Sequence, residues 1–202
     1  MRSYGSERGH TNCPRCEALG AETAVSNIIN YMGEAARRAN PDAVVLAWPY
    51  SAFVWSVDDT QVELIKKLKP GTGILSEIDK DEVMHKDDGI IKPVWDYGID
   101  FVGPSERAKK QIAACKEVGV PIILLSMIEE TLEYTRQPHI PCMDRWADRA
   151  EVLASCGLDG VYVWQMGPYD GTSAGEINKF VSWTPVPERE QLMQSFAARI
   201  AG

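Results

Sequence analysis

Residues 105–125 read SERAKKQIAACKEVGVPIILL, a helix pattern followed directly by the pattern of a buried strand. Ser105 is a suitable N-terminal cap, because its hydroxyl can accept a backbone N–H that the first helical turn leaves unpaired. Apolar residues recur at helical spacing up to Gly119, a residue type that often ends helices. The run Val120–Leu125 has no polar alternation, as is typical of a parallel strand covered on both faces. This stretch therefore predicts one helix-strand unit of an α/β fold.

The same alternation extends in both directions along the chain. Three further short apolar runs predict strands at Ala43–Trp48, Gly73–Glu77 and Gly160–Trp164. Polar residues 79–98 predict a hairpin or a long loop, and Ile99–Val102 is either a strand or the returning arm of that excursion. Helical spacing predicts further helices at four places, namely Cys16–Arg38, the segment capped by Asp58 or Asp59, residues 143–156, and the segment with Leu192, Met193, Phe196 and Ile200.

Strands that alternate with helices form right-handed βαβ units and a parallel sheet. Four strands, or five with Ile99–Val102, are half of the eight that a (β/α)8 barrel needs. An open sheet of strands that are apolar on both faces exposes two edges, which a second copy of the chain could pair. We therefore expect a single half-barrel domain over residues 1–202, completed by homodimerisation. The alternative is an open α/β sandwich whose edges are covered by the N-terminal helix and the 79–98 excursion.

Composition and charge narrow the classes of partner. The chain has 202 residues, with 21 basic against 29 acidic side chains and a formal net charge of −8. A nucleic-acid partner is not expected, because phosphate backbones are bound by basic surfaces. No apolar run approaches the roughly 20 residues of a membrane span, and the polar N-terminus lacks the apolar core of a secretory signal. Five scattered cysteines fit reduced thiols. We expect a soluble, cytoplasmic protein.

Four segments resemble the C-terminal half of glycoside hydrolase barrels of the β-hexosaminidase-like kind. They are NPDAVVLAWPYSA (40–52), DYGIDFVGPSERAKKQIAACKEVGVPI (96–122), IPCMDRWADRAEVLASCGLDGVYVWQMGPY (140–169) and EINKFVSWTP (176–185). The LDGVYVW strand and the aromatic loop after it are the most specific part. The resemblance implies that Trp164 lines a sugar pocket, and that Trp48 and Tyr50 match aromatic residues after the fifth strand. The family's catalytic Asp-Glu pair, which would precede Met1, has no counterpart here.

Barrel enzymes build their sites on the loops that follow the strands, so polar and aromatic residues at those places are candidates. Glu77 and Glu129 are the natural carboxylate pair, since two carboxylates across a cleft can act as acid and base or as acid and nucleophile. The competing interpretation is that both are solvated or paired with Lys80 and Arg136. Aromatic rings beside them would stack on a sugar face or simply cover the core. The expected substrate-binding residues are Trp48, Tyr50, Asp79, Asp96, Tyr97, Trp164 and Gln165.

Two cysteine motifs offer other chemistry. Cys142 begins a predicted helix near His139, so a helix N-terminus could lower the pKa of its thiol and the histidine could act as base. Cys13 and Cys16 form a CxxC pair, and zinc would need two further ligands, of which only His10 is close. The alternatives are a structural metal, a redox pair and plain structural thiols, of which the last is favoured. Phosphate-loop, dinucleotide, zinc-protease and serine-hydrolase motifs are absent from the sequence. No cofactor or metal is expected.

Three functions follow from these patterns. The first is a hydrolase with its site at the barrel mouth, derived from a glycosidase-like barrel. The second is an esterase or phosphotriesterase that uses Cys142 as nucleophile. The third is a carbohydrate-binding remnant without catalysis. All three imply a small-molecule ligand, carbohydrate in the first and third.

Overall fold

A computed structural model describes residues 8–94, 98–127, 142–164, 173–181, 185 and 187–201. The chain divides into two compact units, which are described separately. Unit 1 comprises Met1–Ile78, Ser105–Leu125 and Leu158–Tyr162. Unit 2 comprises Asp79–Pro104, Ser126–Gly157 and Val163–Gly202. Organisation as one domain stays a prediction.

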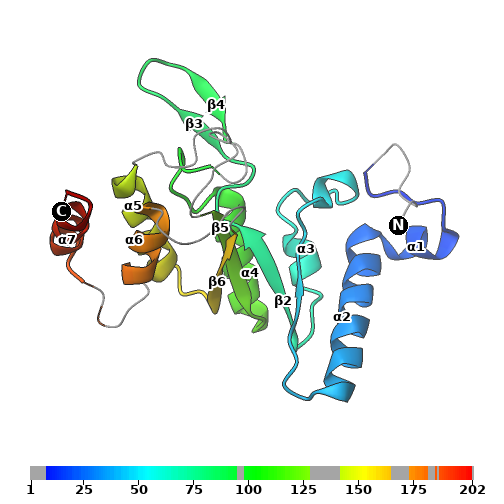
Figure 1. Ribbon diagram of the computed structural model, residues 1–202. Helices are drawn as coiled ribbons and strands as arrows, with labels where there is room; N and C mark the ends of the chain where they lie inside the picture. The colour runs from blue at the N-terminus through cyan, green and yellow to red at the C-terminus, as the bar shows by residue number, and fades with distance from the viewer. Residues whose placement is uncertain are drawn as a thin grey trace. The chain divides into compact units, whose positions relative to one another are not determined.

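A four-stranded parallel sheet forms the centre of unit 1 (Figure 1), and the last residues of its two later strands belong to unit 2. Its order along the sheet is β1-β2-β5-β6. The strands are β1 (Val45–Ala47), β2 (Thr72–Glu77), β5 (Ile122–Met127) and β6 (Gly160–Trp164). All four predicted strands are thus confirmed, and β1 and β6 form the two edges. No fifth strand of this sheet occurs in the described residues, since Ile99–Val102 is not extended into one.

Helix α2 (Ala21–Ala39) packs on β1 and β2, and helix α4 (Glu106–Val118) packs on β2. One predicted helix, Cys16–Arg38, is corrected to two. Gly20 separates them, because its φ of 78° lies in a region that glycine adopts readily and helices exclude. The helical elements of this unit are α1 (Pro14–Leu19), α2 (Ala21–Ala39), the 3-10 turn η1 (Ala52–Val54), α3 (Val62–Ile65) and α4 (Glu106–Val118).

Helix α4 forms as its local sequence predicts. The Ser105 hydroxyl accepts the backbone N–H of Ala108 at 3.2 Å, and Gly119 ends the helix with a left-handed φ of 71°. Helix α3 is shorter than expected, with Gln61 in place of an aspartate at the capping position. The Asp58 carboxylate still accepts the backbone N–H of Glu63 at 2.9 Å, so it stabilises the first turn from outside the helix.

The described residues of unit 2 contain the predicted hairpin and three helices. Strands β3 (Val83–His85) and β4 (Ile91–Pro93) pair antiparallel, which confirms the hairpin within 79–98. Helices α5 (Met143–Ser155) and α7 (Arg189–Ala201) match predicted helices. Helix α6 (Ser173–Val181) was not predicted, because Gly175 lies in its first turn and glycine disfavours helices.

A buried arginine fixes the segment that follows the hairpin. Arg149 of α5 is 1% exposed and donates to the backbone carbonyls of Gly98 at 2.9 Å and Val102 at 3.0 Å, and also to that of Phe101. Arg145 binds the carbonyls of Ile99 and Asp100 in the same way, so the carbonyl groups of this segment bond to guanidinium groups instead of to a neighbouring strand. This explains why Ile99–Val102 is an irregular arm.

The close approach of β2 and β5 requires a glycine. A Cβ atom at Gly73 would lie 2.6 Å from the carbonyl oxygen of Pro121 and 2.7 Å from its Cγ. We expect Gly73→Ala to lower the free energy of unfolding by about 1–3 kcal/mol, because backbone must move to accept the methyl group. Urea denaturation followed by circular dichroism measures the change.

Gly160→Ala in β6 is the matched control. Its Cβ would meet Ile123 at 3.6 Å, an ordinary contact. The expected change is within about 0.5 kcal/mol, since alanine also restricts the unfolded chain. Equal losses in the two variants would contradict the steric account of Gly73.

Candidate functional site

A fully buried carboxylate ends strand β2. Glu77 is 0% exposed, and its Oε2 accepts a hydrogen bond from a terminal nitrogen of Arg107 at 2.9 Å. Its Oε1 accepts the indole N–H of Trp48, which follows β1. The Arg107 side chain is 4% exposed, so both charges of the ion pair lie out of water. Such charges are tolerated only where each compensates the other and hydrogen bonds satisfy the remaining atoms.

A polar network surrounds this ion pair. Arg107 Nε donates to the side-chain oxygen of Gln61 at 2.9 Å, and the Gln111 amide donates to the same oxygen at 3.0 Å. Gln111 also donates to the carbonyl of Thr60 at 2.8 Å, while the Ser76 hydroxyl donates to the Gln111 side-chain oxygen. These bonds join β2, α4 and the turn before α3. Glu77 is thus part of a fixed structural network.

Arg107 is a residue that the sequence reasoning missed. It lies on the buried face of α4, four positions before Gln111 and beside Ala108. Two polar residues four apart on an otherwise apolar helix face are the signal that could have identified it, since long polar side chains are seldom buried unless paired. Its partner could not be read from the sequence, because Glu77 is 30 positions away.

Next to Glu77 lies a pocket of about 400 Å³ within unit 1, here named the aromatic pocket. Trp48 and Tyr50 contact each other in it, with ring centroids 5.5 Å apart and planes tilted by 52°. Trp48 is 43% exposed, so part of its ring is open to a ligand. The lining is Trp48, Tyr50 and Trp55 with Pro49, Ser51, Ala52, the strand residues Val45, Leu46 and Ala47, and Val25, Ile29, Met32 and Leu64 from helices α2 and α3.

The geometry combines aromatic walls with a fixed orientation of one ring. The bond from the indole of Trp48 to Glu77 holds that ring at the edge of the pocket. Aromatic faces of this kind bind apolar surfaces, including the C–H face of a sugar or an aryl ring. The structure therefore brings together three of the predicted site residues, Trp48, Tyr50 and Glu77.

Asp79, a predicted substrate-binding residue, belongs to unit 2 and lies in a second buried ion pair. Its Oδ2 is 3.4 Å from a terminal nitrogen of Arg149, and its exposed fraction is 2%. Arg149 is the same residue that binds the carbonyls of the arm after the hairpin. Asp79 therefore contributes to the core of unit 2.

Cys142 occupies the N-cap position of α5 and is half-buried. Burial raises the pKa of its thiol, and this outweighs the hydrogen bonds that act in the opposite direction. The backbone N–H at the start of the helix does act to lower this pKa, as expected, but burial reverses the net direction. A raised pKa leaves less thiolate at neutral pH and weakens the case for Cys142 as nucleophile.

The other predicted site residues cannot be placed. Trp164 ends β6, but its side chain lies outside the description. The pairs Glu77–Glu129 and Cys142–His139 consequently stay predictions. The residues outside the described part of the chain are Glu129, His139, Asp96, Tyr97 and Gln165.

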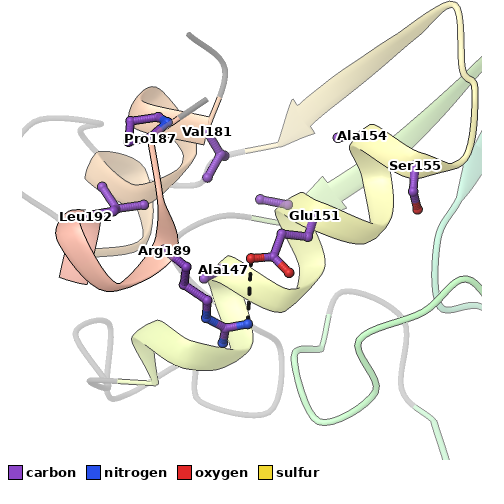
Figure 2. A pocket seen from close by; sticks show the side chains of 9 residues that line it. Ala147, Glu151, Ala154, Ser155, Val181, Pro187, Arg189 and Leu192 are labelled. Atoms are coloured by element: carbon purple, nitrogen blue, oxygen red, sulfur yellow. Dashed lines mark ion pairs between the residues drawn. The ribbon is translucent and has the colours of Figure 1, made fainter. Parts of the chain in front are cut away.

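Unit 2 has a pocket of its own, of about 330 Å³, between α5, α6 and α7 (Figure 2). Small apolar side chains such as Ala147, Val181 and Leu192 line it. Arg189 reaches from α7 toward α5, where its guanidinium lies 3.6 Å from Glu151 and 2.5 Å from Asp148. The hydrogen bond to Asp148 raises the pKa of Arg189. With its one cation paired to two carboxylates, this pocket is best explained as a gap in helix packing.

Comparison with known proteins gives no relative on which a function could be based. No protein-family model, curated protein or solved structure matches the chain significantly. Among the described residues, no helix combines the length and the apolar character that crossing a bilayer requires.

Removing the cation of the buried Glu77–Arg107 pair should lower the stability of the fold. We expect Arg107→Met to lower the free energy of unfolding by about 3–5 kcal/mol, because Glu77 is left buried without its countercharge. Urea denaturation monitored by circular dichroism measures this loss.

Lys109→Met on the same helix is the matched control. Lys109 pairs with Glu106 at the surface, where its side chain is 55% exposed. Loss of this pair should change stability by less than about 1 kcal/mol. If Arg107→Met were as stable as this control, the ion pair would not contribute to the fold as described.

Proposed function

We propose that the aromatic pocket binds a small molecule with a flat apolar face, such as a sugar ring or an aryl group. The observation that carries this is the group of three aromatic rings around about 400 Å³ at the carboxyl end of β1. In α/β folds with parallel strands, ligands bind beyond the carboxyl ends of the strands. A half-exposed tryptophan held by a buried carboxylate is a preformed surface, which lowers the entropic cost of binding.

The resemblance to β-hexosaminidase-like barrels favours a carbohydrate among these ligands. It matches Trp48 and Tyr50 to aromatic residues after the fifth strand of such barrels, and both line the aromatic pocket. Carbohydrate binding without catalysis requires only these rings and polar groups at the rim. It does not require the catalytic Asp-Glu pair of that family.

Hydrolysis of a glycoside is the second candidate, favoured by the direct hydrogen bond between Glu77 and the pocket residue Trp48. A general acid or nucleophile must reach the scissile bond. Glu77 is 0% exposed and paired with Arg107, so catalysis would require this carboxylate to leave its partner. Binding therefore ranks above turnover in this proposal.

We further propose that the sheet is half of a (β/α)8 barrel that a second copy completes. Its edge strands support this, because both carry exposed apolar side chains. Leu46 of β1 is 37% exposed, and the consecutive β6 residues Val161, Tyr162 and Val163 are 43%, 51% and 39% exposed. Consecutive residues of a strand point to opposite faces, so β6 is open on both. Pairing β6 of each copy with β1 of the other would make eight parallel strands and remove the edges.

Ligand binding is tested by calorimetric titration with a panel of aryl glycosides. We expect one or more to bind, and Trp48→Ala to weaken that binding by about tenfold through loss of the stacking surface. Tyr31→Ala is the control, since Tyr31 is 66% exposed on α2 and does not line the pocket. Unchanged affinity in Trp48→Ala would refute the assignment of the pocket.

The same panel separates binding from hydrolysis. Release of the aryl group by the wild-type chain, abolished in a folded Glu77→Gln variant, would establish glycosidase activity. Binding without release would establish a carbohydrate-binding protein. Failure to bind any glycoside or aryl compound would overturn the proposal.

Sedimentation equilibrium tests the completed barrel. We expect a particle of twice the 22.4 kDa chain mass, and Val161→Lys on β6 to convert it to a monomer by placing a charge at the edge. Ile91→Lys on the hairpin, where Ile91 is 64% exposed, should leave the mass unchanged. A wild-type monomer at high protein concentration would contradict dimerisation. It would leave the assignment of the aromatic pocket unchanged.

A further inference from the structure

Two thiols lie one helical turn apart near the N-terminus. Cys13 precedes helix α1, Pro14 is the first helical residue and Cys16 lies within the first turn. Both side chains are half-buried, so reagents can reach them, and they are not joined by a disulfide. The backbone N–H and the thiol of Cys16 both act to lower the pKa of Cys13. Residues three positions apart at the start of a helix are neighbours on its surface, so the CxxC spacing places the two thiols close together.

The residues on either side of the pair are tied together. Glu17 accepts a hydrogen bond from the backbone N–H of Thr11 at 2.7 Å, and its other oxygen is 2.7 Å from Nδ1 of His10. The Thr11 hydroxyl in turn accepts the backbone N–H of Cys13 at 3.3 Å. These bonds connect the segment before Cys13 to the helical turn after it. They hold the two cysteines in one geometry.

A metal site is the competing use of a CxxC pair. Structural zinc takes four ligands. Within the described ranges, no group of three or more His, Cys, Asp or Glu side chains is arranged to hold a metal ion. Two free thiols three residues apart at the start of one helix fit two-electron chemistry between the sulfurs better.

We propose that Cys13 and Cys16 are a redox-active dithiol that undergoes exchange with small-molecule disulfides. The thiolate of Cys13 attacks one sulfur of the disulfide, which forms a mixed disulfide at Cys13 and releases one thiolate. Cys16 then loses its proton to solvent and attacks the sulfur of Cys13, which releases the second thiolate. The pair loses two electrons and two protons, and the small disulfide is reduced to two thiols.

The electrostatics of the pair agree with this order of events. The backbone N–H of Cys16, followed by its thiol, lowers the pKa of Cys13 by hydrogen bonding to that sulfur. The side chain of Cys13 in turn raises the pKa of Cys16. Elsewhere in the chain burial raises the pKa of Cys142, and that of Cys115 to about 12. Cys13 is thus the cysteine expected to attack first.

Oxidised glutathione is the probe, added to the reduced full-length chain and followed by acid quench and peptide mass spectrometry. We expect an intramolecular Cys13–Cys16 disulfide in the wild type and a stable glutathione adduct on Cys13 in Cys16→Ser. In Cys13→Ser, the adduct on Cys16 should form more slowly, because Cys16 lacks the backbone N–H groups that favour the thiolate of Cys13. Cys142→Ser is the matched control and should behave as the wild type.

Three results would overturn the proposal. They are a persistent glutathione adduct on the wild type, equal rates at Cys13 and Cys16 in the two single variants, and protection of both thiols by stoichiometric zinc. Circular dichroism of each variant verifies that it is folded. Recovery of the dithiol on treatment with dithiothreitol, with the disulfide reformed by fresh oxidised glutathione, would support reversible exchange.

Discussion

The ion pair of Glu77 with Arg107 links the end of strand β2, helix α4 and one wall of the aromatic pocket. It places one charge at the end of β2 and the other on the buried face of α4, and neither reaches water. The carboxylate also orients Trp48, so the same group that joins helix to sheet positions a wall of the aromatic pocket. A buried pair contributes little net stability compared with apolar residues, but either partner alone is costly. The Glu77–Arg107 pair therefore mainly fixes geometry, because it allows one arrangement of the end of β2, helix α4 and the indole of Trp48.

This constraint changes the expected chemistry of the site. A carboxylate after a strand of a barrel-like sheet is the usual position for an acid or a nucleophile. Here its oxygens are bonded to Arg107 and Trp48, which makes Glu77 first of all a positioning residue for the pocket. The dithiol near the N-terminus is independent of this network, because it depends only on contacts between residues 10 and 17.

The parts of the fold that the sequence predicted are those set by neighbouring residues. Ser105 and Gly119 bound α4 by capping and by a left-handed turn, and the apolar run before Trp164 forms β6. The contact between Glu77 and Arg107 could not be predicted, because it joins residues that only tertiary packing brings together. The break at Gly20 was missed because the apolar spacing continues across it, while its positive φ interrupts the helix. Among the site residues, the aromatic residues that follow β1 were identifiable because they come directly after a predicted strand, whereas Arg107 was not.

The central claim is that Glu77 and Arg107 stabilise the fold as a pair and hold Trp48 through that pair. A double-mutant cycle with Glu77→Gln, Arg107→Met and the combined variant, measured by urea denaturation, tests it most directly. The account predicts that the combined variant is more stable than the sum of the two single losses implies, by at least about 1 kcal/mol. Losses that add within about 0.3 kcal/mol would mean that the two residues act independently, and this would contradict the account.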